Sequence, residues 1–130
     1  MKKPKIFIAC DTTNLTKIKK IINQSKTNKI KVGYKFGLEF MNSKKGRQFI
    51  STLKNKIIFV DLKLNDTVNT MVSAVKAMKD LKINYLTVHI SSGLSALKAV
   101  KKISGLTKVV GVTTLTSLDN RDLKLIGYNK

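Results

Sequence analysis

Residues 57–60 form the run that most constrains how this chain can fold. Its four side chains, Ile, Ile, Phe and Val, are all apolar and are either β-branched or aromatic. A strand that is apolar on both faces is typical of a parallel sheet covered on both sides. Asp61 and Lys63 follow at once, and alternation along a strand points both side chains to the same face. We therefore expect a buried parallel strand that ends in a pair of opposite charges.

These charges are costly at the end of a buried strand unless each one finds a partner. Taken by themselves, Asp61 and Lys63 are most simply interpreted as a structural ion pair. Asp66 adds a second carboxylate three positions beyond Lys63. The segment that follows the strand is therefore the first place to look for a functional site.

Strand-like and helix-like segments alternate along the whole chain. Apolar runs predict strands at residues 5–10, 29–33, 57–62, 84–89 and 108–113. Apolar side chains at helical spacing predict helices at residues 15–25, 44–54, 66–81 and 93–103, with a last helix that begins near Leu118. No linker or low-complexity tract interrupts the pattern, so we expect a single domain over residues 1–130.

Alternating strands and helices favour a parallel sheet, which leaves two architectures to consider. An open doubly wound sheet that binds a dinucleotide should carry a glycine-rich turn after its first strand, but residues 11–14 read Asp-Thr-Thr-Asn. Polar residues lie at or near the end of each expected strand: Asp11, Lys31, Asp61, Lys63, His89 and residues 113–116. Barrel enzymes place their chemistry there, so we expect an α/β fold of the (β/α)8 TIM-barrel type, truncated to roughly five strands.

The chain is strongly basic, with a formal net charge of +19 at pH 7. Such a charge attracts polyanions, but 24 of the 26 basic residues are lysines spread along the chain, whereas nucleic-acid readers favour arginine. We therefore expect no nucleic-acid partner. No apolar run approaches the roughly 18 residues of a membrane span. The single Cys10, which we expect in the core, suits a cytoplasmic protein, and one Cys with one His leaves little for a zinc site.

Five segments, in order along the chain, resemble the orotidine 5′-monophosphate decarboxylase family of cofactor-free lyases, which make UMP. Residues 61–66 fit the family's Asp-x-Lys-x-x-Asp signature, and Asn69 with Thr70 completes its loop. The other matching segments are residues 9–11 (Ala-Cys-Asp), 31–33 (Lys-Val-Gly) with 37–40 (Gly-Leu-Glu-Phe), 88–93 (Val-His-Ile-Ser-Ser-Gly) and 112–117 (Val-Thr-Thr-Leu-Thr-Ser). The resemblance covers essentially the whole chain and implies a barrel enzyme that needs no cofactor and no metal.

The resemblance implies a role for each matching charged residue. Lys63 would donate the proton to C6 of the pyrimidine, and Asp61 would lie against the substrate carboxylate. Lys31 would hold Asp61 and the ribose in a charged network. Asp66 would act in the neighbouring subunit's site of a homodimer. A fixed ammonium at the carbon where negative charge develops stabilises that transition state, which agrees with these roles.

The resemblance also implies which residues bind orotidine 5′-monophosphate. Asp11 would bind a ribose hydroxyl, while Thr70 and Thr116 would contact the nucleotide. The rest of the predicted substrate-binding set combines the signature loop with the charged residues: Leu62, Leu64, Asn65, Thr67, Val68 and Asn69, beside Lys31, Asp61, Lys63 and Asp66. We expect Tyr34 and Lys35 to be loop and surface residues, and His89 to have a structural role.

Length is the main departure from the family. A (β/α)8 barrel typically needs about 250 residues, with roughly 200 near the lower limit, and this sequence has 130. The family holds the substrate phosphate with loops after strands seven and eight, which find no counterpart here. We therefore expect a fragment whose open sheet edges invite pairing with another chain, and whose activity alone is weak or absent.

Two alternatives stay open. A sugar-phosphate decarboxylase of the 3-keto-L-gulonate 6-phosphate type shares the signature. That enzyme uses magnesium and has a Glu near its second strand, where Glu39 is the only candidate. The Leu-Thr-Ser segment at residues 115–117 favours the orotidine 5′-monophosphate decarboxylase family over this alternative. The other alternative is a basic nucleic-acid-binding protein without catalysis, which steep salt dependence of binding would identify.

Overall fold

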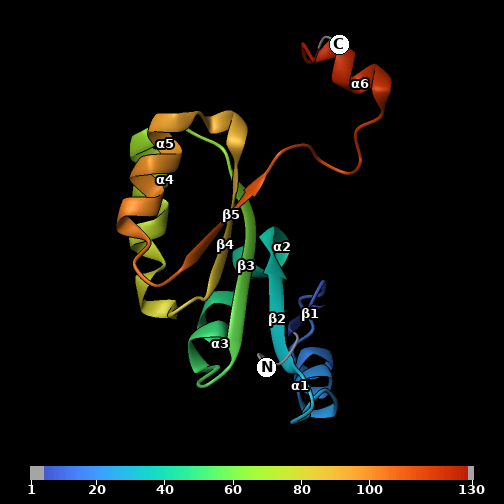
Figure 1. The fold of residues 1–130 in the computed structure, drawn as a ribbon. Coiled ribbons are helices and arrows are strands. Elements are labelled where there is room, and N and C mark those ends of the chain that lie inside the picture. Colours follow the sequence, from blue (N-terminus) through green and yellow to red (C-terminus); the bar gives the residue numbers. More distant parts are fainter. Residues whose placement is uncertain (1–4, 129–130) are drawn as a thin grey trace.

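The computed structural model describes residues 5–128, and its centre is one parallel sheet. Five strands lie side by side in chain order (Figure 1): β1 (Lys5–Ala9), β2 (Lys31–Gly37), β3 (Ile57–Leu64), β4 (Tyr85–His89) and β5 (Lys108–Val112). A doubly wound sheet places its first strand inside the sheet. Here β1 and β5 are the two edges, so the strand order is that of consecutive strands of a barrel, as expected.

Helices follow every strand. They are α1 (Leu15–Gln24), α2 (Leu38–Asn42), α3 (Gly46–Thr52), α4 (Val68–Ala77), α5 (Leu94–Ile103) and α6 (Asn120–Leu125), with short 3-10 turns η1 (Lys79–Leu81) and η2 (Ile90–Ser92). In Figure 1, α4 and α5 lie side by side, while α6 stands away from the sheet at the end of an extended segment. Within residues 5–128, no helix is long and apolar enough to cross a membrane.

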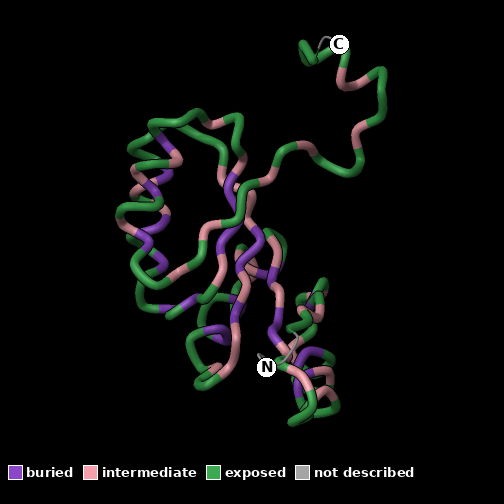
Figure 2. The backbone as a smooth tube through the Cα atoms, viewed as in Figure 1, coloured by how far each residue is buried: buried purple, intermediate pink, exposed green. Residues whose placement is uncertain are grey.

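The hydrophobic core lies between the helices and one face of the sheet. Alternate residues of the central strands are fully buried there, among them Phe36, Val60 and Leu86. The apolar stripes of the helices complete the same cluster, with Ile18 from α1 and Val100 from α5. Figure 2 shows the buried segments running along the sheet and along the inward sides of α4 and α5.

The other face of the sheet carries aromatic side chains that are only half-buried. Phe7, Phe59 and Tyr85 pack edge-on or tilted, with ring centroids 5.0–5.8 Å apart. Gly33 makes room for them, because a Cβ at this position would lie 2.6 Å from the Phe7 ring. In a closed barrel this face of each strand points to the interior. The same face carries the charged residues closer to the carboxyl ends of the strands.

Most expected elements are confirmed to within a few residues at each end, but one strand has different bounds and one helix was not expected. The second strand was expected at residues 29–33 and instead runs from Lys31 to Gly37. The expected helix at residues 44–54 is confirmed as α3, but a short helix that was not expected, α2, precedes it, and Ser43 separates the two with an extended backbone, φ −72° and ψ 150°. The extension of β2 moves a different lysine to the end of the strand.

Candidate active site

Two neighbouring strands bring one carboxylate and two ammonium groups together toward their carboxyl ends. Lys35 of β2 and Lys63 of β3 each place Nζ 3.0 Å from a different oxygen of Asp61. Asp61 is buried, whereas both lysines are partly exposed. A buried carboxylate flanked by two cations has a full set of charge-assisted partners. The predicted pairing of Asp61 with Lys63 is confirmed.

Thr87 of β4 connects this charged group to the backbone. Its hydroxyl donates to Asp61 Oδ1 at 2.9 Å and accepts from the Lys63 N–H at 2.8 Å. Thr87 is buried between Leu86 and Val88, which point to the core. Sequence reasoning missed this residue. The available signal was a single hydroxyl inside an apolar strand, which must find a hydrogen-bond partner when buried.

The backbone of β3 is irregular where it carries the site. Its pairing with β4 shifts register between Val60 and Leu64. Within this bulge Lys63 adopts a left-handed conformation with φ 49°. A residue with a β-carbon is strained there, and such strain collects at functional sites. A bulge changes the direction of the side chain that it carries, and here the Lys63 ammonium donates to Asp61 while the Lys63 N–H donates to Thr87.

The charge state of Asp61 follows from its neighbours. Burial by itself raises the pKa of this carboxyl, but hydrogen bonds from Lys63, Lys35 and Thr87 outweigh it and leave the pKa below the ordinary 3.8. Asp61 is therefore an anion at neutral pH. The site presents alternating charges in the order Lys35, Asp61, Lys63, which can hold a polar substrate and place an ammonium beside a reacting carbon.

The prediction that Lys31 pairs with Asp61 is wrong. Lys31 is the first residue of β2 and lies opposite Lys5, at the amino end of the sheet. Lys35, which was expected at the surface, occupies the predicted role, because β2 continues past Gly33 as far as Gly37. Tyr34 is not a loop residue either, since its side chain is buried in the core.

The signature loop lies beyond β3 and is exposed from Asn65 to Thr70. Asp66 Oδ1 accepts from the Thr67 N–H at 2.6 Å, and the Thr67 and Thr70 hydroxyls lie 3.0 Å apart. None of the ion pairs within residues 5–128 includes Asp66. Its carboxylate is thus available to a ligand or a partner, and its predicted role across a dimer interface stays a prediction.

The remaining predicted residues are spread around this end of the sheet. Asp11 follows β1, and the Cys10 N–H donates to the Lys35 carbonyl at 2.8 Å, so Asp11 stands near the end of β2. Leu62 and Leu64 pack against the core, so their side chains point away from the charged residues. Four positions are exposed and keep their binding roles as predictions: Val68, Asn69, Thr70 and Thr116.

The neighbours of the site fit the structural roles expected for them. Burial, with the Asp11 charge adding to it, raises the pKa of the Cys10 thiol to about 11, so the thiol stays protonated at neutral pH. His89 ends β4 with its Nδ1 3.5 Å from the Ser91 hydroxyl, and the side chains that hydrogen-bond to Asp61 are Lys35, Lys63 and Thr87 instead. Neither residue joins the charged group.

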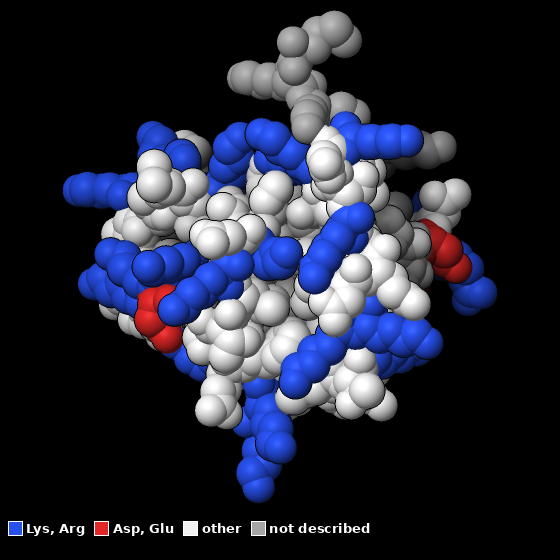
Figure 3. Space-filling model, turned by 90° about the horizontal axis from the view of Figure 1, so that it is seen from below, with Lys and Arg blue, Asp and Glu red and all other residues white. Residues whose placement is uncertain are grey.

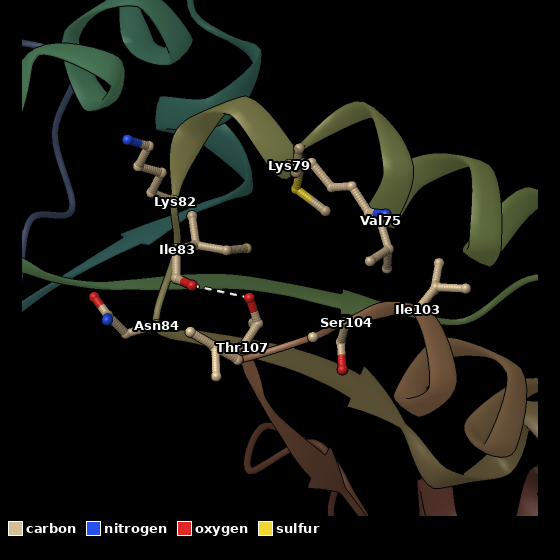
Figure 4. Close-up of a pocket in the computed structure, with 11 residues that line it drawn as sticks. Val75, Lys79, Lys82, Ile83, Asn84, Ile103, Ser104 and Thr107 are labelled. Carbon is tan, nitrogen blue, oxygen red and sulfur yellow. Dashed lines mark hydrogen bonds between the residues drawn. The ribbon is translucent and has the colours of Figure 1, made fainter.

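A cavity of about 480 Å³ lies at the opposite end of the sheet (Figure 4). Val75, Ile83 and Ile103 line it, together with the stems of Lys79 and Lys82. Thr107 closes one side by donating to the Ile83 carbonyl at 2.9 Å. The lining of this cavity contains no carboxylate and no ion pair, in contrast to the Asp61 group.

Comparison with known proteins identifies the family of the chain. A family model described as orotidine 5′-phosphate decarboxylase / HUMPS family matches residues 4–129. A curated orotidine 5′-phosphate decarboxylase of Ehrlichia chaffeensis is 44% identical over 100 residues, covering 74% of this chain and 43% of that protein. One from Wolbachia sp. subsp. Brugia malayi is 40% identical over 126 residues, covering 94% and 55%. The chain thus spans about half the length of these relatives.

Solved structures lead to the same family. The orotidine 5′-phosphate decarboxylase of Lactobacillus acidophilus superposes with a TM-score of 0.81 at 30% identity, covering 98% of this chain and 60% of that one. The Methanocaldococcus jannaschii enzyme, solved with the inhibitor BMP, gives 0.73 at 26% identity, covering 85% and 52%. The fold is therefore part of a TIM barrel, and the chain belongs to the orotidine 5′-phosphate decarboxylase / HUMPS family.

Proposed function

We propose that this chain carries the decarboxylation chemistry of an orotidine 5′-monophosphate decarboxylase, which converts OMP to UMP and CO2 in pyrimidine biosynthesis. One observation carries the proposal: the buried Asp61 carboxylate lies between the ammonium groups of Lys35 and Lys63, 3.0 Å from each. The complete activity belongs to a longer assembly, because the relatives are about twice as long.

Lys63 has the central role in the proposed reaction. The bond between C6 and the carboxyl carbon breaks, CO2 leaves, and the electron pair stays on C6 of the pyrimidine. The Lys63 ammonium stabilises this developing negative charge and then transfers a proton to C6. The strained backbone at Lys63 keeps the ammonium aimed before substrate arrives. No metal or organic cofactor enters the proposed step.

Asp61 contributes by remaining charged. Its lowered pKa keeps a carboxylate next to the position proposed for the substrate carboxylate. Two like charges held together favour loss of CO2, because the repulsion disappears when the neutral gas leaves. Lys35 takes the role first predicted for Lys31, holding Asp61 and reaching the ribose. The ammonium groups of Lys35 and Lys63 offset part of the repulsion between Asp61 and the substrate carboxylate, so that the substrate can bind.

Several finer proposals follow from the family. Asp11 binds a ribose hydroxyl, Thr70 and Thr116 contact the nucleotide, and Asp66 reaches into the site of a second subunit in a homodimer. We place the protein in the cytoplasm and treat residues 1–130 as a single domain of partial-barrel type. The exposure of Asp66 outside any ion pair in the described chain supports its role at an interface.

The test is a UV assay of OMP decarboxylation, with UMP identified by chromatography. We would assay the chain alone and a chimera completed by the C-terminal half of the Wolbachia relative. Turnover that disappears in Lys63→Ala supports the proposal. A folded chimera that binds UMP but does not release CO2 refutes it.

Two lysines of one strand provide the matched control. Lys35→Ala should abolish turnover in the chimera, since it removes a partner 3.0 Å from Asp61. Lys31→Ala removes the same charge at the other end of β2 and should leave turnover within a factor of about two, because Debye screening weakens its field at the site. Equal losses in both variants would contradict the assignment of the site.

A further inference from the structure

The amino ends of the strands carry a second polar cluster, at the opposite end of the sheet from Asp61. Lys5, Lys31 and Lys108 are the first residues of β1, β2 and β5, and Tyr85 is the first residue of β4. Register pairs Lys5 with Lys31 and Tyr85 with Lys108. The cluster therefore converges from four different strands on one place.

The Tyr85 hydroxyl is the centre of this cluster. Lys5 Nζ donates to it and also lies 4.9 Å from the ring centroid, while Lys108 Nζ lies 5.8 Å from the same centroid. The rings of Phe7 and Phe59 pack against Tyr85 and fix its position. The lysines and the tyrosine line a cavity of about 260 Å³, which is room for a small anion.

The charges of this cluster are not balanced by acidic residues. The cavity lining contains no carboxylate, and no ion pair within residues 5–128 includes Lys5, Lys31 or Lys108. Figure 3, seen from below, shows basic side chains around a paler centre, with acidic side chains only toward the margins. Three like charges that approach one another repel, and a bound anion removes that repulsion.

The lysines of this cluster lower the pKa of Tyr85. The hydrogen bond from Lys5 lowers the pKa of the phenol, burial opposes this effect, and the charges of Lys108, Lys5 and Lys31 lower the pKa further. The cluster thus favours a negative charge at the phenol oxygen. An external anion placed against the same lysines would be favoured for the same reason.

We propose that Lys5, Lys31, Lys108 and the Tyr85 hydroxyl bind a multiply charged phosphate anion at the amino end of the sheet. Lysine ammonium groups bind phosphate as point charges, and a hydroxyl adds a directed donor. The neighbouring Asn84 uses its side-chain oxygen to accept from the Ile58 N–H, so its NH2 group is a further donor in the cavity lining. A two-phosphate anion offers oxygens to all of these donors at once.

The site is independent of the proposed decarboxylase chemistry. Its residues lie at the amino ends of the strands, whereas Lys35, Asp61 and Lys63 lie near the carboxyl ends of theirs. Lys63→Ala should therefore leave anion binding unchanged. A failure of this proposal leaves the proposed function standing, and the reverse also holds.

The test uses pyrophosphate as the probe, in calorimetric titration at about 0.1 M salt, where longer-range charge effects are screened. One variant combines Lys5→Ala, Lys31→Ala and Lys108→Ala. The matched control combines Lys17→Ala, Lys19→Ala and Lys20→Ala, three exposed lysines of α1 that remove the same net charge. We expect the first variant to bind at least about tenfold more weakly, and the control to change by less than about threefold.

Absorbance of the tyrosine phenolate gives a second, local readout. Saturating pyrophosphate should raise the pKa of Tyr85, because a bound anion opposes ionisation of the phenol, and Tyr85→Phe should remove this response. Equal weakening in both triple variants, or no change in the phenolate titration, overturns the proposal and leaves only non-specific attraction by net charge. Tight binding of an RNA oligonucleotide but not of pyrophosphate overturns it in favour of a nucleic-acid surface.

Discussion

Replacing Thr87 with valine tests how the site is held together. Valine keeps the shape of threonine and its preference for strands, so the change removes a hydroxyl without opening a cavity. Two hydrogen bonds are lost: the one to Asp61 Oδ1 at 2.9 Å and the one from the Lys63 N–H at 2.8 Å. The N–H is then left unpaired inside a strained bulge.

The magnitude follows from these two contacts. A hydrogen bond to a charged group contributes roughly 1.5–3 kcal/mol, and an unpaired N–H costs about 1–3 kcal/mol. Asp61 keeps both lysines, so we take the lower half of the combined range and expect Thr87→Val to lower the free energy of unfolding by about 2.5–4 kcal/mol. That is a large share of the roughly 5–15 kcal/mol that stabilises an ordinary domain.

The assay is urea unfolding followed by circular dichroism, with the slope m compared between variants. Thr107→Val is the matched control, since it loses one neutral hydrogen bond, to the Ile83 carbonyl, and should cost about 1 kcal/mol. Combining Thr87→Val with Asp61→Asn should give a loss smaller than the sum of the two single losses, because both remove the same contact. If Thr87→Val costs no more than Thr107→Val at equal m, the proposed coupling through Thr87 is refuted.

Four further predictions concern the site and its surroundings. Lys35→Ala should raise the pKa of Asp61 and Lys31→Ala should not, as measured by carboxyl NMR titration, because Lys35 donates to that carboxylate whereas Lys31 lies at the other end of β2. The pKa of Asp61 is lowered on folding, so the unfolded state binds more protons than the folded state at low pH. The free energy of unfolding should therefore fall as the pH drops below 3.8 and through the folded pKa. Asp61→Asn should flatten this part of a profile of urea midpoint against pH. Lys63→Gly should be more stable than Lys63→Ala by about 1 kcal/mol in urea unfolding, because glycine accepts φ 49° without strain, and equal stabilities would contradict the strained bulge. Cys10 should react slowly with iodoacetamide at pH 8 and faster only as pH approaches about 11; rapid alkylation at pH 8 in the folded chain would contradict its burial.

The order of the elements was predictable because hydrophobic periodicity dominates this chain. Ile58 and Val60 mark a central strand without ambiguity, and both are buried. The extent of β2 was not predictable in the same way. Lys35 interrupts an apolar run and resembles the start of a loop, yet it belongs to the face of the strand that points away from the core. Periodicity identifies which positions face the core better than it identifies where a strand stops.

The charged site was predictable in part for a related reason. Asp61 and Lys63 are adjacent in sequence and follow a strand, so local pattern was enough to pair them. Lys35 and Thr87 reach Asp61 only through the pairing of neighbouring strands, which depends on register. The left-handed backbone at Lys63 could not be inferred, because lysine has no preference for that conformation. Tertiary contacts imposed it.

The sequential strand order has a consequence for how this chain folds during synthesis. Each strand pairs with the strand before it, and paired residues such as Phe59 and Tyr85 lie roughly 25 positions apart in the chain. A new strand therefore finds its partner already formed as it leaves the ribosome, at a rate set by translation. The sheet can grow from its amino-terminal edge by one strand and its connecting helices at a time, and no earlier strand has to move aside for a later one.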